Sequence, residues 1–153
     1  MRFGMRLTVR HPGFFTLVQD LGRIGFRRYG VSVGGALDPH ALRIANLLVE
    51  NEDGAAGLEI TFGGFRGQFE DRRLVAWCGG AFDVRIGTES LPAGHVGAID
   101  VGEELIVNPP KLGAKRIIES FFTNVSAVLR SPFKSNDNIA PPFPFIVRRT
   151  ISY

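Results

Sequence analysis

The stretch that decides the fold is residues 33–54, which read VGGALDPHALRIANLLVENEDG. Asp38 is a good helix N-cap, because its carboxylate can accept the unpaired N–H groups of the first helical turn. Pro39 then takes the first helical position, where its missing N–H costs no hydrogen bond. We therefore predict one helix over residues 39–50, closed by Asn51 and Gly54. Its apolar stripe would comprise Ala41, Ile44, Ala45 and Leu48.

Outside this helix, apolar and polar residues alternate in short runs, the period-2 pattern of half-buried strands. Such runs cover residues 6–10, 58–62 and 73–77. Glycine turns predict two hairpins, one over residues 81–91 and one over residues 96–107. Short strands with frequent glycine turns predict a mainly β chain, folded as a barrel or a sandwich.

The length of 153 residues is enough for one domain with a hydrophobic core. No apolar run approaches the roughly 20 residues that a membrane helix needs, so we expect no membrane span. Cys78 is the single cysteine, so no internal disulfide can form. This fits a reducing compartment and predicts a cytoplasmic protein.

Charge and glycine both change near Gly113. Residues 1–113 carry 12 basic and 13 acidic side chains, so the net charge of +3 comes from residues 114–153. A body without basic excess argues against nucleic-acid binding. All 19 glycines lie at or before Gly113. We predict a body over residues 1–113 and a divergent tail over 114–153. This tail is either a native segment that packs on a partner or the product of truncation or a frame change.

Several familiar motifs fail. The chain has no glycine followed by lysine, so a phosphate-binding loop of the Walker type is not supported. Its three histidines lack ligand spacing, and we expect no metal site. Residues 30–34 match the G-x-S-x-G nucleophile elbow around Ser32, but that elbow needs a helix directly after the serine. A glycine-rich turn leading into the helix is the better interpretation.

Polar side chains gather among small turn residues between Gln19 and Gly25. Arg23 offers a planar fork for a carboxylate or a phosphate, and Asp20 is either part of that site or an internal ion-pair partner. Asp38 caps the helix or stands at the edge of a pocket. Asn46 is a poor helix former that either bonds to a loop or serves a ligand. Glu59 is either a solvated residue or a pocket carboxylate suited to proton transfer.

These segments resemble the amino-terminal half of the family of C-type 5-oxoprolinase subunits, also called allophanate hydrolase subunit 2 or biotin-dependent carboxyltransferase. Glu50 stands where that family usually has glycine. After residue 114 the chain leaves the family pattern, which favours truncation or a frame change over a native tail. The segments that carry the resemblance are residues 13–23, 30–38, 45–51, 58–61 and 78–81.

The resemblance implies a partial cyclophilin-like β-barrel and work as one subunit of a complex. The implied reaction is ATP-dependent hydrolysis of 5-oxoproline to glutamate, or a related urea or allophanate reaction on a small amide or lactam. ATP would be held by a partner or a composite site, and the carboxylase relatives would also use biotin. The implied partners are a homologous carboxyltransferase subunit of the B type and a 5-oxoprolinase subunit of the A type.

The same resemblance suggests which residues carry the chemistry. The expected catalytic residues are Asp38 and Glu59. The expected substrate-binding residues are Gln19, Asp20, Arg23, Gly34, Gly35 and Asn46. Two alternatives stay open, a non-catalytic regulatory subunit like the antagonists of a sporulation kinase, and an inactive fragment.

Overall fold

The computed structural model describes residues 6–110 and two further strands, at 124–130 and 146–149. These residues form strands, one α-helix and one short 3₁₀ helix. In chain order the elements are β1 (Arg6–Pro12), β2 (Phe15–Gln19), η1 (Arg27–Tyr29), α1 (Pro39–Leu48), β3 (Gly57–Thr61), β4 (Phe65–Phe69), β5 (Arg73–Gly79), β6 (Asp83–Ile86), β7 (Glu89–Ser90), β8 (Val96–Ile99), β9 (Glu104–Asn108), β10 (Asn124–Arg130) and β11 (Ile146–Arg149).

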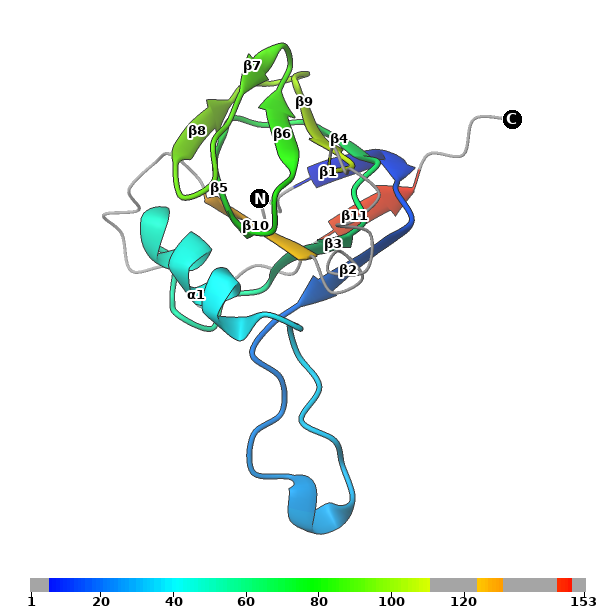
Figure 1. Ribbon diagram of the computed structural model, residues 1–153, viewed down its shortest axis with the longest axis vertical. Coiled ribbons are helices and arrows are strands. Elements are labelled where there is room, and N and C mark those ends of the chain that lie inside the picture. The colour runs from blue at the N-terminus through cyan, green and yellow to red at the C-terminus, as the bar shows by residue number, and fades with distance from the viewer. Residues whose placement is uncertain (1–5, 111–123, 131–145, 150–153) are drawn as a thin grey trace, which may run out of the picture.

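The strands form two sheets that curve around a shared interior (Figure 1). One sheet has six strands in the order β11-β1-β4-β9-β6-β7, and the other has five in the order β2-β3-β10-β5-β8. The prediction of a mainly β chain with one helix is confirmed. Among the described strands, no pairing joins the two sheets into a closed barrel.

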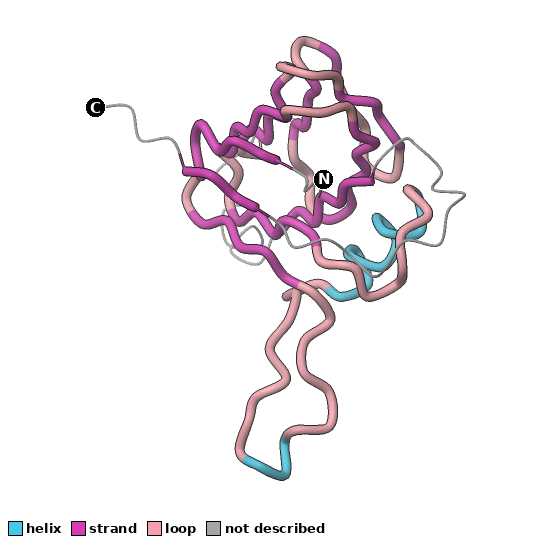
Figure 2. The backbone as a smooth tube through the Cα atoms, turned by 180° about the vertical axis from the view of Figure 1, so that it is seen from behind, coloured by secondary structure: helices cyan, strands magenta, loops and turns pink. Residues whose placement is uncertain are grey.

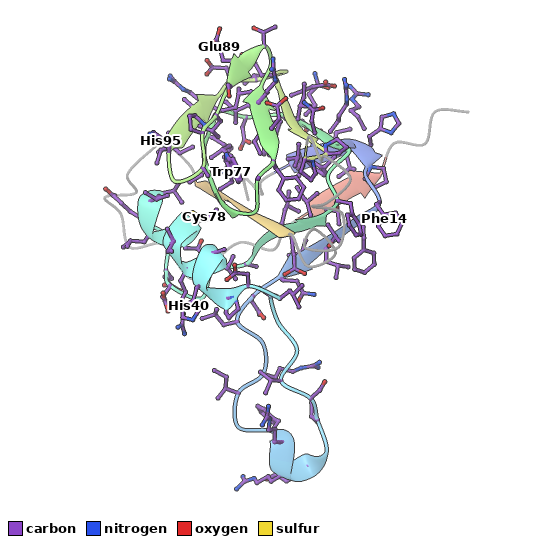
Figure 3. All side chains as sticks on the ribbon, viewed as in Figure 1. Phe14, His40, Trp77, Cys78, Glu89 and His95 are labelled. Carbon is purple, nitrogen blue, oxygen red and sulfur yellow. The ribbon has the colours of Figure 1, made fainter. Side chains whose placement is uncertain are left out.

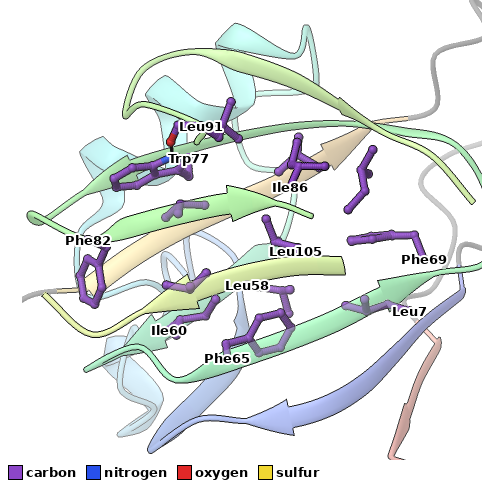
Figure 4. Close-up of a cluster of buried hydrophobic side chains, with 14 of the residues drawn as sticks. Leu7, Leu58, Ile60, Phe65, Phe69, Trp77, Phe82, Ile86, Leu91 and Leu105 are labelled. Carbon is purple, nitrogen blue, oxygen red and sulfur yellow. Dashed lines mark hydrogen bonds between the residues drawn. The ribbon is translucent and has the colours of Figure 1, made fainter. Parts of the chain in front are cut away.

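The main core lies between the two sheets (Figure 4). Phe65 and Phe69 enter it from the six-stranded sheet, and Ile60 and Ile99 enter it from the five-stranded sheet. Burying each such side chain contributes about 1.5–3 kcal/mol. The indole N–H of Trp77 is also satisfied, since it donates to the carbonyl of Leu91 at 2.7 Å. The alternation of apolar residues along the strands thus supplies both inner faces.

Helix α1 starts as the sequence predicts. The Asp38 carboxylate accepts the N–H of Ala41 at 2.9 Å, which confirms the N-cap. The helix ends at Leu48, before the predicted residue 50. Glu50 adopts a left-handed backbone with φ 55°, which no α-helix can continue through.

The predicted apolar stripe of α1 is wrong in part. Ala41 and Ala45 are buried against Ala76 and Cys78 of β5, with Leu42 and Val49 beside them. Ile44 is instead 51% exposed. The helix is apolar on several faces, so periodicity alone could not choose which face packs on the sheet.

The predicted hairpins have different outcomes. β6 and β7 pair as expected, with Arg85 opposite Ser90. The second hairpin is wrong, because β8 pairs with β5 whereas β9 pairs with β4 and β6. The turn at Gly102 therefore carries the chain from one sheet to the other. Sequence reasoning also missed β2 and β4, although Phe65, Gly67 and Phe69 point inward with the period of a strand.

Two segments of the predicted tail are strands. β10 lies in the middle of the five-stranded sheet, between β3 and β5. β11 runs parallel to β1 at an edge of the six-stranded sheet. The predicted boundary at Gly113 lies outside the described residues. That boundary, and the origin of the tail, stay predictions.

Replacing Glu50 with glycine is expected to raise the free energy of unfolding by about 0.5–1 kcal/mol, because glycine adopts positive φ without strain. Glu50→Ala is the matched control, since it removes the same carboxylate and keeps a Cβ at positive φ. Urea denaturation of both variants measures the difference. Equal stability of the two variants would contradict a backbone cause.

Candidate functional site

Residues 20–38, which we call the arm, leave the body after β2 and return at the start of α1. The arm extends away from both sheets in opposite views, with η1 at its tip (Figures 1 and 2). Its two legs are joined near the body by backbone hydrogen bonds. The N–H of Arg23 donates to Val33 at 2.7 Å, and the N–H of Ala36 donates to Asp20 at 2.8 Å. We call this joined part the neck.

Glycines let the two legs of the neck approach closely. A Cβ on Gly22 would lie 2.5 Å from the carbonyl oxygen of Val33, and a Cβ on Gly35 would lie 2.7 Å from the nitrogen of Gly22. Side chains cannot approach backbone atoms so closely without displacing them. The glycine-rich sequence therefore brings residues 20–23 against residues 33–36.

At the base of the arm, Glu59 ties the chain down. Its carboxylate accepts the N–H of Leu37 at 2.6 Å and is nearly buried. Asp38 follows directly, so the structure brings the two predicted catalytic carboxylates to one place. Gln19 lies at the same end of β2, paired with Gly57. Sequence reasoning missed Leu37, because its contribution is a backbone N–H that no side-chain pattern reveals.

Asp20 and Arg23 are not ion-pair partners. Among described residues, the ion pairs do not include one between them. Asp20 instead accepts the N–H of Gly22 at 2.7 Å, which fixes the turn. The exposed guanidinium of Arg23 has no partner in the described part of the chain, and the same holds for the N–H groups of Gly34 and Gly35. The neck therefore offers a cation and backbone donors close to one another.

Asn46 lies apart from the neck, on the packed face of α1. Its side chain is fully buried and donates to the carbonyl of Ala55 at 2.7 Å. It also accepts a hydrogen bond from the Asn51 amide at 3.0 Å. These bonds hold the loop that follows the helix, which is the first of the two interpretations that the sequence left open.

The remaining reactive side chains do not form a second centre. Ser32 is exposed on the arm, where neither a strand precedes it nor a helix follows directly. Burial, helped by the charge of Asp38 and opposed by a backbone hydrogen bond from Gly94, raises the pKa of the Cys78 thiol. A protonated thiol is a poor nucleophile. His40 and His95 lie on different parts of the molecule (Figure 3).

Metal, membrane and nucleotide sites were also considered for the described residues. These residues hold no group of three or more His, Cys, Asp or Glu side chains placed to bind a metal ion. None of their helices has the length and apolarity to cross a membrane. An open cleft of about 370 Å³ lies along β6 and β7, with Arg85 as its cation. Arg85 already pairs with Asp83 at 3.2 Å, so this cleft is not built for a nucleotide triphosphate.

The family model described as carboxyltransferase domain, subdomain A and B, matches residues 29–120. The chain belongs to this family. The C-type 5-oxoprolinase subunit of Escherichia coli strain K12 is 39% identical over 109 residues, which are 71% of this chain and 35% of that protein. The urea amidolyase of Lachancea kluyveri is 29% identical over 108 residues, which are 70% of this chain and 6% of that protein.

Solved structures of carboxyltransferase relatives agree with the fold. The crystal structure of TTHA0988 superposes with a TM-score of 0.69 at 27% identity, covering 80% of this chain and 43% of that one. The Kluyveromyces lactis urea carboxylase gives 0.71 at 26% identity, covering 85% of this chain and 11% of that one. This carboxyltransferase-family chain thus spans about a third of the length of the E. coli 5-oxoprolinase relative.

Proposed function

We propose that the chain is part of a carboxyltransferase-type subunit that binds a small amide or lactam at the neck of the arm. The observation that carries this proposal is the pairing of Arg23 with Val33 through the backbone, which places an unpaired guanidinium beside the free N–H groups of Gly34 and Gly35. Guanidinium and backbone N–H groups together suit a substrate carboxylate and a developing oxyanion. Family membership supports 5-oxoproline or a urea derivative as the substrate.

The two carboxylates at the base have different access. Glu59 is nearly buried and is bonded to the arm, so it positions the neck. Asp38 is exposed and uses one oxygen for the helix cap, which leaves the other for a substrate proton. We assign the proton transfer to Asp38. Gln19 and Asp20 orient the substrate and the turn, whereas the proposal leaves Asn46 out because its amide is occupied.

ATP and biotin enter the proposal only through partners. The described residues form no phosphate-binding loop, and the open cleft has no unpaired cation. We place ATP on a subunit of the A or B type, or at a site shared with one, and biotin on a separate carrier domain if a carboxylation applies. The alternative of a purely regulatory subunit predicts stable assembly without turnover.

Reconstitution with the A-type and B-type subunits tests the proposal, with 5-oxoproline-dependent ATP hydrolysis as the readout. Arg23→Ala is expected to lower this activity about 10-fold, because a hydrogen bond to a charged group contributes about 1.5–3 kcal/mol. Arg43→Ala is the matched control, since Arg43 pairs with Asp53 on the surface of α1, away from the neck.

Full activity of an Asp20→Ala/Arg23→Ala double variant would sink the proposed site. Assembly of all subunits without any turnover by the unaltered chain would favour the regulatory alternative.

A further inference from the structure

Exposed apolar side chains gather on one segment of the chain. Nine of the eleven large hydrophobic residues that stand exposed in the described part fall between Phe14 and Leu47. That segment comprises β2, the arm and most of α1, and the other two are Val96 and Val101. A contiguous apolar surface of this kind marks an interaction site more often than scattered exposed residues do.

The arm tip shows this most clearly. Ile24 is 74% exposed, Phe26 51% and Tyr29 64%. The two rings lie 6.4 Å apart, and the guanidinium of Arg28 lies 4.7 Å from the centre of the Tyr29 ring. Holding a backbone segment in one conformation costs about 1–2 kcal/mol per residue. A tip that extends away from the body gains little packing to offset that cost, so a partner surface is the natural source.

Charge indicates what kind of partner fits. Residues 21–37 contain Arg23, Arg27 and Arg28 and no acidic residue. A two-fold dimer through this surface would place the same arginines opposite one another, because both copies of such an interface use the same patch. Like charges in contact are unfavourable, whereas an acidic surface is attracted. The arm therefore fits a different polypeptide rather than a second copy of this chain.

Strand β2 extends the same surface onto the body. Among the described strands it pairs only with β3, so its other edge is open. Phe15 and Val18 on this strand are 52% and 42% exposed. An open apolar strand edge is a template for pairing with another chain. The open backbone groups favour a protein over a lipid surface, which offers no strand to pair with.

We propose that the arm tip and the open edge of β2 form a docking surface for a protein whose apolar groove has an acidic rim, and that this protein is the B-type carboxyltransferase subunit. The surface is argued from this chain's own residues, whereas the choice of subunit rests on the proposed function. Ile24, Phe26 and Tyr29 would enter the groove. Arg27 and Arg28 would contact its acidic rim.

The test is the affinity of the full chain for the B-type subunit of the same organism, measured by titration calorimetry. An Ile24→Ser/Phe26→Ser/Tyr29→Ser variant is expected to bind about 30-fold more weakly, since buried aromatic side chains dominate interface energies. Arg27→Glu/Arg28→Glu is expected to bind about 10-fold more weakly, with association that no longer slows as salt is added. Val96→Ser/Val101→Ser is the control and should bind as the unaltered chain does.

Three outcomes would overturn the proposal: no binding by the unaltered chain, equal binding by the tip variant, and arm-dependent self-association in sedimentation velocity. Tip-dependent binding to phosphatidylserine vesicles but not to the B-type partner would also overturn it, in favour of a membrane. The altered residues do not include Arg23, so the two proposals can fail separately. Tip-dependent binding without 5-oxoproline-dependent turnover supports the docking surface and counts against the proposed function.

Discussion

Replacing Asn46 with alanine is expected to lower the free energy of unfolding by about 3 kcal/mol. The substitution removes two hydrogen bonds of a fully buried amide, to the carbonyl of Ala55 and from the side chain of Asn51. Each bond contributes about 1 kcal/mol, and the partner groups and the cavity left behind add to the loss. Thermal and urea denaturation measure the effect.

Leu47→Ala is the matched control for Asn46→Ala. It lies one position further along the same helix and loses more carbon atoms, but its side chain is 76% exposed. A surface substitution of this kind is expected to change stability by less than about 0.5 kcal/mol. If both variants lost the same stability, the buried amide would not be the cause.

Replacing Gly63 with alanine is expected to cost about 2–5 kcal/mol. Gly63 lies in the turn between β3 and β4 with φ 72°. A Cβ there would lie 2.8 Å from the carbonyl group of Asn108 and from the nitrogen of Pro109. Positive φ costs about 1–2 kcal/mol for a residue with a side chain, and displacing a packed backbone costs about 1–3 kcal/mol more.

Gly64→Ala separates these two contributions. Gly64 has φ 78°, so it shares the backbone strain, but a Cβ there meets only the Cα of Gly13 at 3.4 Å. The expected cost is about 1–2 kcal/mol from strain alone. A larger loss for Gly64→Ala than for Gly63→Ala would show that the close approach to Asn108 is unimportant.

The sequence by itself determined the local features. The carboxylate of Asp38 and the ring of Pro39 fix the start of α1 through bonds within the first turn, so no distant residue is needed. Alternation along β1, β3 and β5 predicted strands, because one face of each is buried. The glycine-rich arm neck and the family were also readable from the chain, since both depend on short stretches of residues.

Only the tertiary structure decided which surfaces meet. The face of α1 that packs, the separation of β8 from β9 into different sheets and the place of β10 all depend on segments distant in sequence. The bond from Leu37 to Glu59 belongs to the same class, because its donor is a backbone N–H that every residue except proline carries. A pattern along the chain records which residues prefer burial, but it does not record which of several apolar surfaces finds a partner.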